Sequence, residues 1–279
     1  MALCTAWTTW SILTSILALT SLTNAAIPSQ KTIWQPPVGA TWQIVLSTTL
    51  GSTIPDVSVF DIDLFNTPKS TIDHLHTLNR RVICYFSAGT YEDWRPDAPS
   101  FPASDIGSPL EDWEGESWID LRSAGIRDIM TSRLDIAVAK GCDGVDPDNV
   151  DAYNNDQGGL DLTAEDSIDF MDWLAGEAHA RGLSIGLKNA VSIIPSVIGK
   201  MQWSVNEQCT EWDECDEYTP FLAKGKPVFH IEYPKGDEVN DQKTVSGQKK
   251  ENVCSGFENA GLFSTLIKNM NLDRWVQPC

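Results

Sequence analysis

Residues 141–153, GCDGVDPDNVDAY, concentrate acidic side chains at Asp143, Asp146, Asp148 and Asp151. The first half of this stretch has the pattern of a buried β-strand, so a hydrophobic segment ends in a group of carboxylates. Buried carboxylates are costly unless they are paired or protonated. A group of this kind can bind a metal ion, hold the hydroxyls or amines of a sugar, or supply the two carboxyl groups that hydrolyse a glycosidic bond.

The sequence gives little support to a metal site. The continuation DPDNVDAYNNDQGG resembles a calcium loop, but Val150 interrupts the ladder of oxygen ligands and Gln157 replaces the bidentate glutamate. Three of the four histidines fall in predicted helices, and His230 suits a core position better than a site. No cysteine spacing matches a zinc site. We therefore expect neither a metal nor another cofactor.

Eight apolar, β-branched runs alternate with helical segments along the chain. The predicted strands are residues 42–46, 57–62, 81–86, 142–147, 183–187, 202–206, 227–231 and 263–267. The clearest helices are predicted at residues 123–140 and 163–181, the second with Thr163 as its N-cap and Asp166 in a capping box. This alternation predicts an α/β fold, a single (β/α)8 TIM-type barrel. An open doubly wound sheet is the alternative, but VLSTTLGST lacks its glycine-rich first turn.

In such a barrel the functional groups lie at the carboxyl ends of the strands. Polar residues follow nearly every predicted strand and would form one ring. They are Asp61, Asp63, Tyr85, Ser87, Gly89, Asp146, Asp148, Asn149, Lys188, Asn189, Glu207, Glu232, Tyr233, Lys268 and Asn269.

The composition is strongly acidic, with a formal charge of −19 and a pI near 4.4. This charge argues against a nucleic-acid partner, whose phosphates would be repelled. It suits a cationic ligand, although it also suits simple solubility. Four tryptophans in loops after strands could stack on sugar rings or merely pack those loops: Trp94, Trp113, Trp118 and Trp212.

The first 25 residues carry no Asp, Glu, Lys or Arg and end in small residues. This pattern predicts a secretory signal peptide over residues 1–25, with an uncleaved anchor as the alternative. Residues 26–279 would form one catalytic domain of a secreted, extracellular monomer that is not stably inserted in a membrane. The six remaining cysteines allow fifteen disulfide connectivities. Their positions favour Cys209 with Cys215, Cys254 with Cys279, and Cys84 with Cys142.

Seven segments in order resemble glycoside hydrolase family 114, the endo-α-1,4-polygalactosaminidases. They are WQPPVGATWQIVLS, DVSVFDIDLFNTP, VICYFSAGTYEDWRPD, GESWIDLR, GCDGVDPDNVDAY, SVNEQC and VFHIEY. The resemblance runs from about Trp34 to Tyr233. It implies a (β/α)8 barrel that hydrolyses α-1,4-linked galactosamine in galactosaminogalactan-type polysaccharide. Its catalytic aspartate and glutamate map onto Asp148, expected as nucleophile, and Glu207, expected as acid/base. Retention is the expected outcome, while Asp146 could exchange roles with Asp148.

The expected substrate is a partly deacetylated, and therefore cationic, galactosamine polymer, which would give the acidic composition a purpose. The residues expected to line its groove are Asp61, Asp63, Tyr85, Ser87, Glu92, Asp146, Asn149, Asp151, Lys188, Asn189, Glu232 and Tyr233. The competing hypotheses are a non-catalytic carbohydrate-binding barrel and a hydrolase of another amino-sugar polymer.

Overall fold

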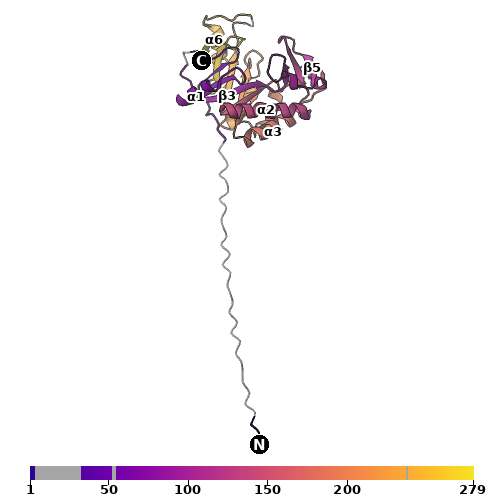
Figure 1. Ribbon diagram of the computed structural model, residues 1–279. Coiled ribbons are helices and arrows are strands. Elements are labelled where there is room, and N and C mark those ends of the chain that lie inside the picture. Colours follow the sequence, from indigo (N-terminus) through magenta and orange to yellow (C-terminus); the bar gives the residue numbers. More distant parts are fainter. Residues whose placement is uncertain (4–32, 52–54, 237) are drawn as a thin grey trace. The chain divides into compact units, whose positions relative to one another are not determined.

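The computed structural model describes residues 1–3, 33–51, 55–236 and 238–279. One compact unit spans Thr32–Cys279 (Figure 1). The predicted signal peptide, apart from residues 1–3, lies outside the described residues. None of the described helices is long and apolar enough to cross a membrane.

Eight parallel strands form the barrel, each within two residues of its predicted bounds. They pair in the order β1 (Trp42–Val45), β2 (Val59–Asp63), β3 (Arg81–Ser87), β7 (Gly144–Asp148), β8 (Ser184–Lys188), β9 (Trp203–Glu207), β10 (Val228–Glu232) and β11 (Ser264–Lys268). These strands are buried along nearly their whole length, which is why they are rich in Val, Ile and Phe. The predicted barrel is confirmed.

In the described part of the chain no backbone ladder joins β1 and β11. Side-chain hydrogen bonds connect these two strands instead and close the barrel. The Trp42 indole N–H donates to the Ser264 carbonyl at 2.7 Å, and the Ser264 hydroxyl donates to the Ala40 carbonyl at 2.7 Å. The buried Lys268 ammonium donates to the Ile44 carbonyl at 2.8 Å. A short antiparallel strand, β12 (Val276–Pro278), pairs with the other edge of β11.

The helices are less regular than the alternating pattern predicts. The α-helices in the described part of the chain are α1 (Lys69–Thr77), α2 (Ala124–Lys140), α3 (Ala164–Ala180), α4 (Ile194–Val197), α5 (Thr219–Ala223) and α6 (Gln248–Ser255). Single 3₁₀ turns are η1 (Ala98–Ser100), η2 (Ala103–Asp105), η3 (Ala152–Asn154), η4 (Asp156–Gly159), η5 (Val191–Ile193), η6 (Cys215–Tyr218) and η7 (Ala260–Leu262).

Helices α2 and α3 confirm the two clearest predictions, and Thr163 and Asp166 form the capping box at the start of α3. The expectation of a helix after every strand is wrong. Among the described residues no helix lies between β1 and β2, and those after β8 and β9 are very short. Proline at the start of both short helices fixes where they begin but adds no length.

An insertion after β3 forms a second, three-stranded antiparallel sheet. Its strands β4 (Thr90–Glu92), β5 (Ile106–Pro109) and β6 (Glu116–Ile119) pair in the order β4-β6-β5. These strands are short and contain few apolar residues, so no clear strand pattern marks them in the sequence. The insertion lies before α2 in the chain and provides part of the candidate site.

All three favoured disulfides are present. Cys84 of β3 is bonded to Cys142, just before the neighbouring strand β7. Cys209 and Cys215 close a short loop directly after β9. Cys254 of α6 is bonded to the C-terminal Cys279.

Candidate active site

A cavity of about 940 Å³ opens at the carboxyl ends of the barrel strands. Asp63, Asp148, Lys188 and Glu207 are the last residues of β2, β7, β8 and β9, and all four line it. The strand-end pattern in the sequence therefore placed these side chains correctly. On the side of the inserted sheet the lining includes Glu92, Trp94, Ser108, Pro109, Leu110, Glu111, Asp112, Trp113, Glu116 and Trp118.

Asp148 and Glu207 face the same ammonium group. The Lys188 nitrogen lies 3.0 Å from one Asp148 oxygen and 2.9 Å from one Glu207 oxygen. These two oxygens can therefore be no farther apart than the sum of those distances. The Asp148 and Glu207 side chains are 14% and 21% exposed, whereas that of Lys188 is 1% exposed. Two reachable carboxylates are thus held over one buried cation.

Asp148 is oriented by three donors. The Tyr85 hydroxyl, at 2.9 Å, and the Lys188 ammonium share one of its oxygens, and the backbone N–H of Asn149 donates to the other at 2.8 Å. Burial, together with the charge of Asp148, raises the pKa of Tyr85 well above its ordinary value, so this hydroxyl keeps its proton. Asn149 has φ of 63°, a left-handed conformation that asparagine tolerates better than most residues.

Glu207 has a matching set of donors. The Tyr233 hydroxyl donates to one of its oxygens, and the Asn189 side-chain amide donates to the other at 3.2 Å. Burial acts to raise the pKa of Glu207, but the Lys188 charge and the hydrogen bonds outweigh it, so the pKa lies below its ordinary value. Glu207 is therefore ionised at neutral pH in the free protein.

Lys188 keeps its charge despite complete burial. Burial alone would lower its pKa, but the carboxylates of Asp148, Glu207 and Asp146 raise it well above the ordinary value. The Lys188 charge in turn lowers the pKa of Glu207.

Asp61 and Asp146 lie deeper in the barrel and do not reach the cavity. Both are fully buried, and none of their four carboxylate oxygens has a hydrogen-bond partner among the described residues. Burial and the neighbouring Asp146 raise the pKa of Asp61 well above its ordinary value. Burial, partly offset by Lys188, raises the pKa of Asp146 to about 7. This pair therefore holds protons at a pH where Glu207 is ionised.

We expect the Asp61–Asp146 pair to make the fold less stable as pH rises. The folded protein keeps protons that unfolded aspartates lose above pH 3.8, so the stabilisation is complete below that pH and is lost toward about pH 7. One such group changes the free energy of unfolding by up to about 1.4 kcal/mol per pH unit. Urea unfolding of wild type and Asp146→Asn from pH 4 to 8 should show a flatter profile in the variant. The exposed Asp128→Asn is the control, and equal slopes in wild type and Asp146→Asn would disprove this explanation.

The other residues expected to line a groove fall into two groups. Tyr85, Glu92, Asn149, Asp151 and Asn189 join Asp63 and Lys188 in the cavity lining. Ser87, Glu232 and Tyr233 are buried behind it. Ser87 accepts a hydrogen bond from the Asn149 side chain at 2.9 Å, and Tyr233 supports Glu207.

Sequence reasoning gave no site role to two cavity-lining residues of the inserted sheet region. Arg95 pairs with Asp63 at 2.8 Å and with Glu92 at 2.7 Å, so it neutralises two cavity acids. Glu116 lies in the GESWIDLR segment, two residues before Trp118, and also lines the cavity. Of the four tryptophans proposed to stack on sugar, Trp94, Trp113 and Trp118 line the cavity, whereas Trp212 is outside its lining.

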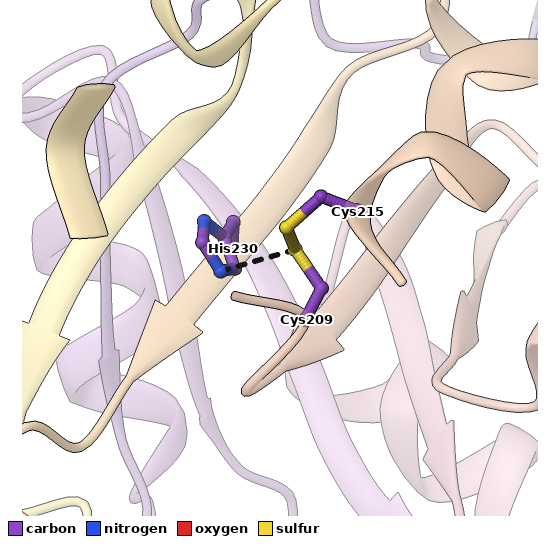
Figure 2. Close-up of side chains that lie close together, drawn as sticks. All are labelled: Cys209, Cys215 and His230. Atoms are coloured by element: carbon purple, nitrogen blue, oxygen red, sulfur yellow. Dashed lines mark hydrogen bonds between the residues drawn. A yellow bond between two sulfur atoms is a disulfide. The ribbon is translucent and has the colours of Figure 1, made fainter. Parts of the chain in front are cut away.

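The loop after Glu207 is fixed by a disulfide and a buried histidine (Figure 2). Cys209, Cys215 and His230 are the one group in the described chain with metal-ligand spacing, but both sulfurs are bonded to each other. The His230 Nε2 lies 2.8 Å from Glu232 and 3.4 Å from the Cys209 sulfur. Its ring packs edge-on against aromatic side chains of the core, as expected for a core residue. The arrangement is structural and braces the loop that follows Glu207.

Comparison with known proteins gives a consistent picture. The model of the Glycoside-hydrolase family GH114 matches residues 23–279. The crystal structure of Aspergillus fumigatus Ega3 in complex with galactosamine is similar with 58% sequence identity and a TM-score of 0.86, over 88% of this chain and 97% of that chain. No protein matches in the comparison with curated proteins.

A more distant likeness concerns the fold alone. The glycoside hydrolase domain of PelA from Pseudomonas aeruginosa is 12% identical, with a TM-score of 0.65 over 85% of this chain and 97% of that chain. The same barrel is thus retained where little sequence similarity remains.

Proposed function

The chain belongs to glycoside hydrolase family GH114, as its ordered segments predicted, and on that premise we propose that it is a secreted, endo-acting hydrolase of α-1,4-linked galactosamine in galactosaminogalactan-type polysaccharide. The observation that carries this proposal is the Asp148–Lys188–Glu207 arrangement at the bottom of an acidic, tryptophan-lined cavity.

The separation of the two carboxylates supports a retaining reaction. Retaining enzymes place their carboxyl groups roughly 5–5.5 Å apart, and inverting enzymes place them roughly 6.5–9.5 Å apart to admit a water molecule. The facing oxygens of Asp148 and Glu207 both contact Lys188, at 3.0 and 2.9 Å, which keeps these two oxygens closer together than the inverting range. We assign Asp148 as the nucleophile and Glu207 as the acid/base.

In the first step an oxygen of Asp148 attacks the anomeric carbon of the bound galactosamine. The bond from that carbon to the leaving sugar breaks, and Glu207 gives its proton to the leaving oxygen. Water then attacks the sugar–Asp148 ester, its proton passes to Glu207, and the Asp148 carboxylate is released. Because Glu207 is ionised in the free protein, it must gain a proton as the substrate binds; desolvation by the sugar raises a carboxyl pKa and favours that uptake.

The cavity wall supports a cationic amino-sugar substrate. Glu111, Asp112, Glu116, Asp151 and Asp156 line it in addition to Asp63 and Glu92, which are paired with Arg95, and exposed Trp94 and Trp113 lie beside them. Carboxylates attract ammonium groups, and flat indole faces stack on sugar rings. Galactosamine is the ligand of the related Ega3 structure.

We assign residues 1–25 to a cleaved signal peptide and residues 26–279 to one catalytic domain that acts as a monomer. Three disulfides support an extracellular location, because such bonds persist in oxidising compartments.

The proposal is tested by incubating the purified protein with partly deacetylated galactosaminogalactan and following product size by mass spectrometry. An endo-acting enzyme should release oligomers of mixed length early, before single sugars accumulate. Early release of single sugars only would contradict endo action. Binding of the polymer without any release would favour a carbohydrate-binding barrel, and cleavage of a different amino-sugar polymer alone would overturn the substrate.

A further inference from the structure

Glu116 is a cavity acid that has no cation of its own. It begins β6, is 9% exposed and lines the cavity. One of its oxygens accepts a hydrogen bond from the Thr90 hydroxyl at 2.9 Å. Within the described residues Glu116 makes no salt bridge, and no hydrogen bond reaches its other oxygen.

Glu92 and Glu116 are direct partners across β4 and β6, but their charged neighbours differ. Like charges placed opposite each other destabilise a sheet. Glu92 is paired with Arg95 at 2.7 Å, and Arg133 lies 3.8 Å from its second oxygen. Glu116 has only a hydroxyl as donor. Burial raises the pKa of Glu116 to about 7, with the charges of Glu92 and Asp148 adding to the effect and the Thr90 hydrogen bond and the charge of Arg95 offsetting only part of it. A bound cation would relieve this unfavourable environment.

Glu116 is also connected to the proposed nucleophile. Thr90, which donates to Glu116, receives a hydrogen bond from the Asn149 side chain at 3.4 Å. The backbone N–H of Asn149 donates to Asp148 at 2.8 Å. A ligand group held by Glu116 is therefore held at a fixed position relative to Asp148.

An aromatic side chain, Trp94, lies beside the backbone that leads into β6, where its ring leaves little room for a side chain at Gly115. Trp94 is half exposed and lines the cavity. A sugar ring stacked on this indole would therefore occupy the same cavity that Glu116 lines.

We propose that Glu116 is a specificity-determining residue that binds the ammonium group of a galactosamine unit and so favours free over N-acetylated amino sugar. The inference rests on the proposed function, since it assigns one contact of that substrate. A free ammonium supplies the missing cation, whereas an N-acetyl group is neutral and leaves a buried carboxyl group without a charged partner.

The test measures binding in a background without turnover. Titration calorimetry would give the Kd of Asp148→Asn and of Asp148→Asn/Glu116→Gln for a galactosamine oligomer and for an N-acetylgalactosamine oligomer of equal length. Loss of a charge-assisted contact of about 1.5–3 kcal/mol corresponds to roughly a 10- to 100-fold weaker Kd. We expect that loss for the galactosamine oligomer only, so that the preference between the two ligands falls by the same factor.

The control is Asp148→Asn/Glu114→Gln, because Glu114 is exposed on the same hairpin and outside the cavity lining. Thermal unfolding checks that each variant is folded. An unchanged galactosamine Kd in the Glu116→Gln variant, or an equal loss for both oligomers, would overturn the inference. This outcome is distinct from failure of the proposed function, in which wild type would not cleave the polymer while the binding comparison could still be made.

Discussion

Replacement of Asp148 by Asn is expected to lower kcat on the galactosamine polymer by at least about 10³-fold. The amide nitrogen cannot attack the anomeric carbon, so no covalent intermediate forms. The substitution keeps the size of the side chain and can keep the hydrogen bond from Tyr85. The loss should therefore appear in kcat, with little change in KM, and is measured from the rate of reducing-end formation.

Two further variants show whether the loss of activity is specific to position 148. Asp161→Asn is the matched control, because Asp161 is exposed and its left-handed backbone is one that Asn adopts readily. Asp146→Asn tests the neighbouring aspartate, which is fully buried below the cavity. Substantial activity in Asp148→Asn together with an inactive, folded Asp146→Asn would show that the nucleophile has been assigned to the wrong residue.

Replacement of Glu207 by Gln is expected to lower kcat/KM on the polymer by about 10²–10⁴-fold, because general acid catalysis to the leaving sugar is lost. On a substrate whose leaving group needs no proton, the rate of the first step, formation of the covalent intermediate, should fall much less. Added azide, which needs no general base, should then restore turnover and give a glycosyl azide of retained configuration.

The pH profile supplies a second readout for Glu207. In wild type, kcat/KM should fall as pH rises above the lowered pKa of Glu207, since only the protonated acid can donate. That decline should be absent in Glu207→Gln. If azide rescued Asp148→Asn with retained configuration and did not rescue Glu207→Gln, the two roles would be reversed.

The barrel was predictable because its strands are buried on both faces and therefore form continuous apolar runs. The same regularity located Asp148, Lys188 and Glu207, since each follows directly on such a run. The inserted sheet gave no comparable signal, because its strands are short and partly polar. Glu116 and Arg95 were missed for that reason, although both lie in the cavity.

Burial depth was the other quantity that the sequence could not supply. Asp61 and Asp63 lie two residues apart on one strand, as do Asp146 and Asp148, so both members of each pair point into the barrel. Only the structure shows that the first of each pair lies a layer below the cavity. The ion pairs of the site also join residues that are far apart in the sequence. Lys188, Asp148 and Glu207 lie on three different strands and meet only in the folded barrel.

The most direct test of the Asp148–Glu207 account is to trap the covalent intermediate. Glu207→Gln would be mixed with an α-galactosaminyl donor that carries an activated leaving group, and the intact protein and its proteolytic peptides would be weighed by mass spectrometry. The account predicts one added galactosaminyl unit on the peptide containing Asp148, and no addition in Asp148→Asn/Glu207→Gln. An adduct on a different carboxyl group, or no adduct together with a product of inverted configuration, would contradict it.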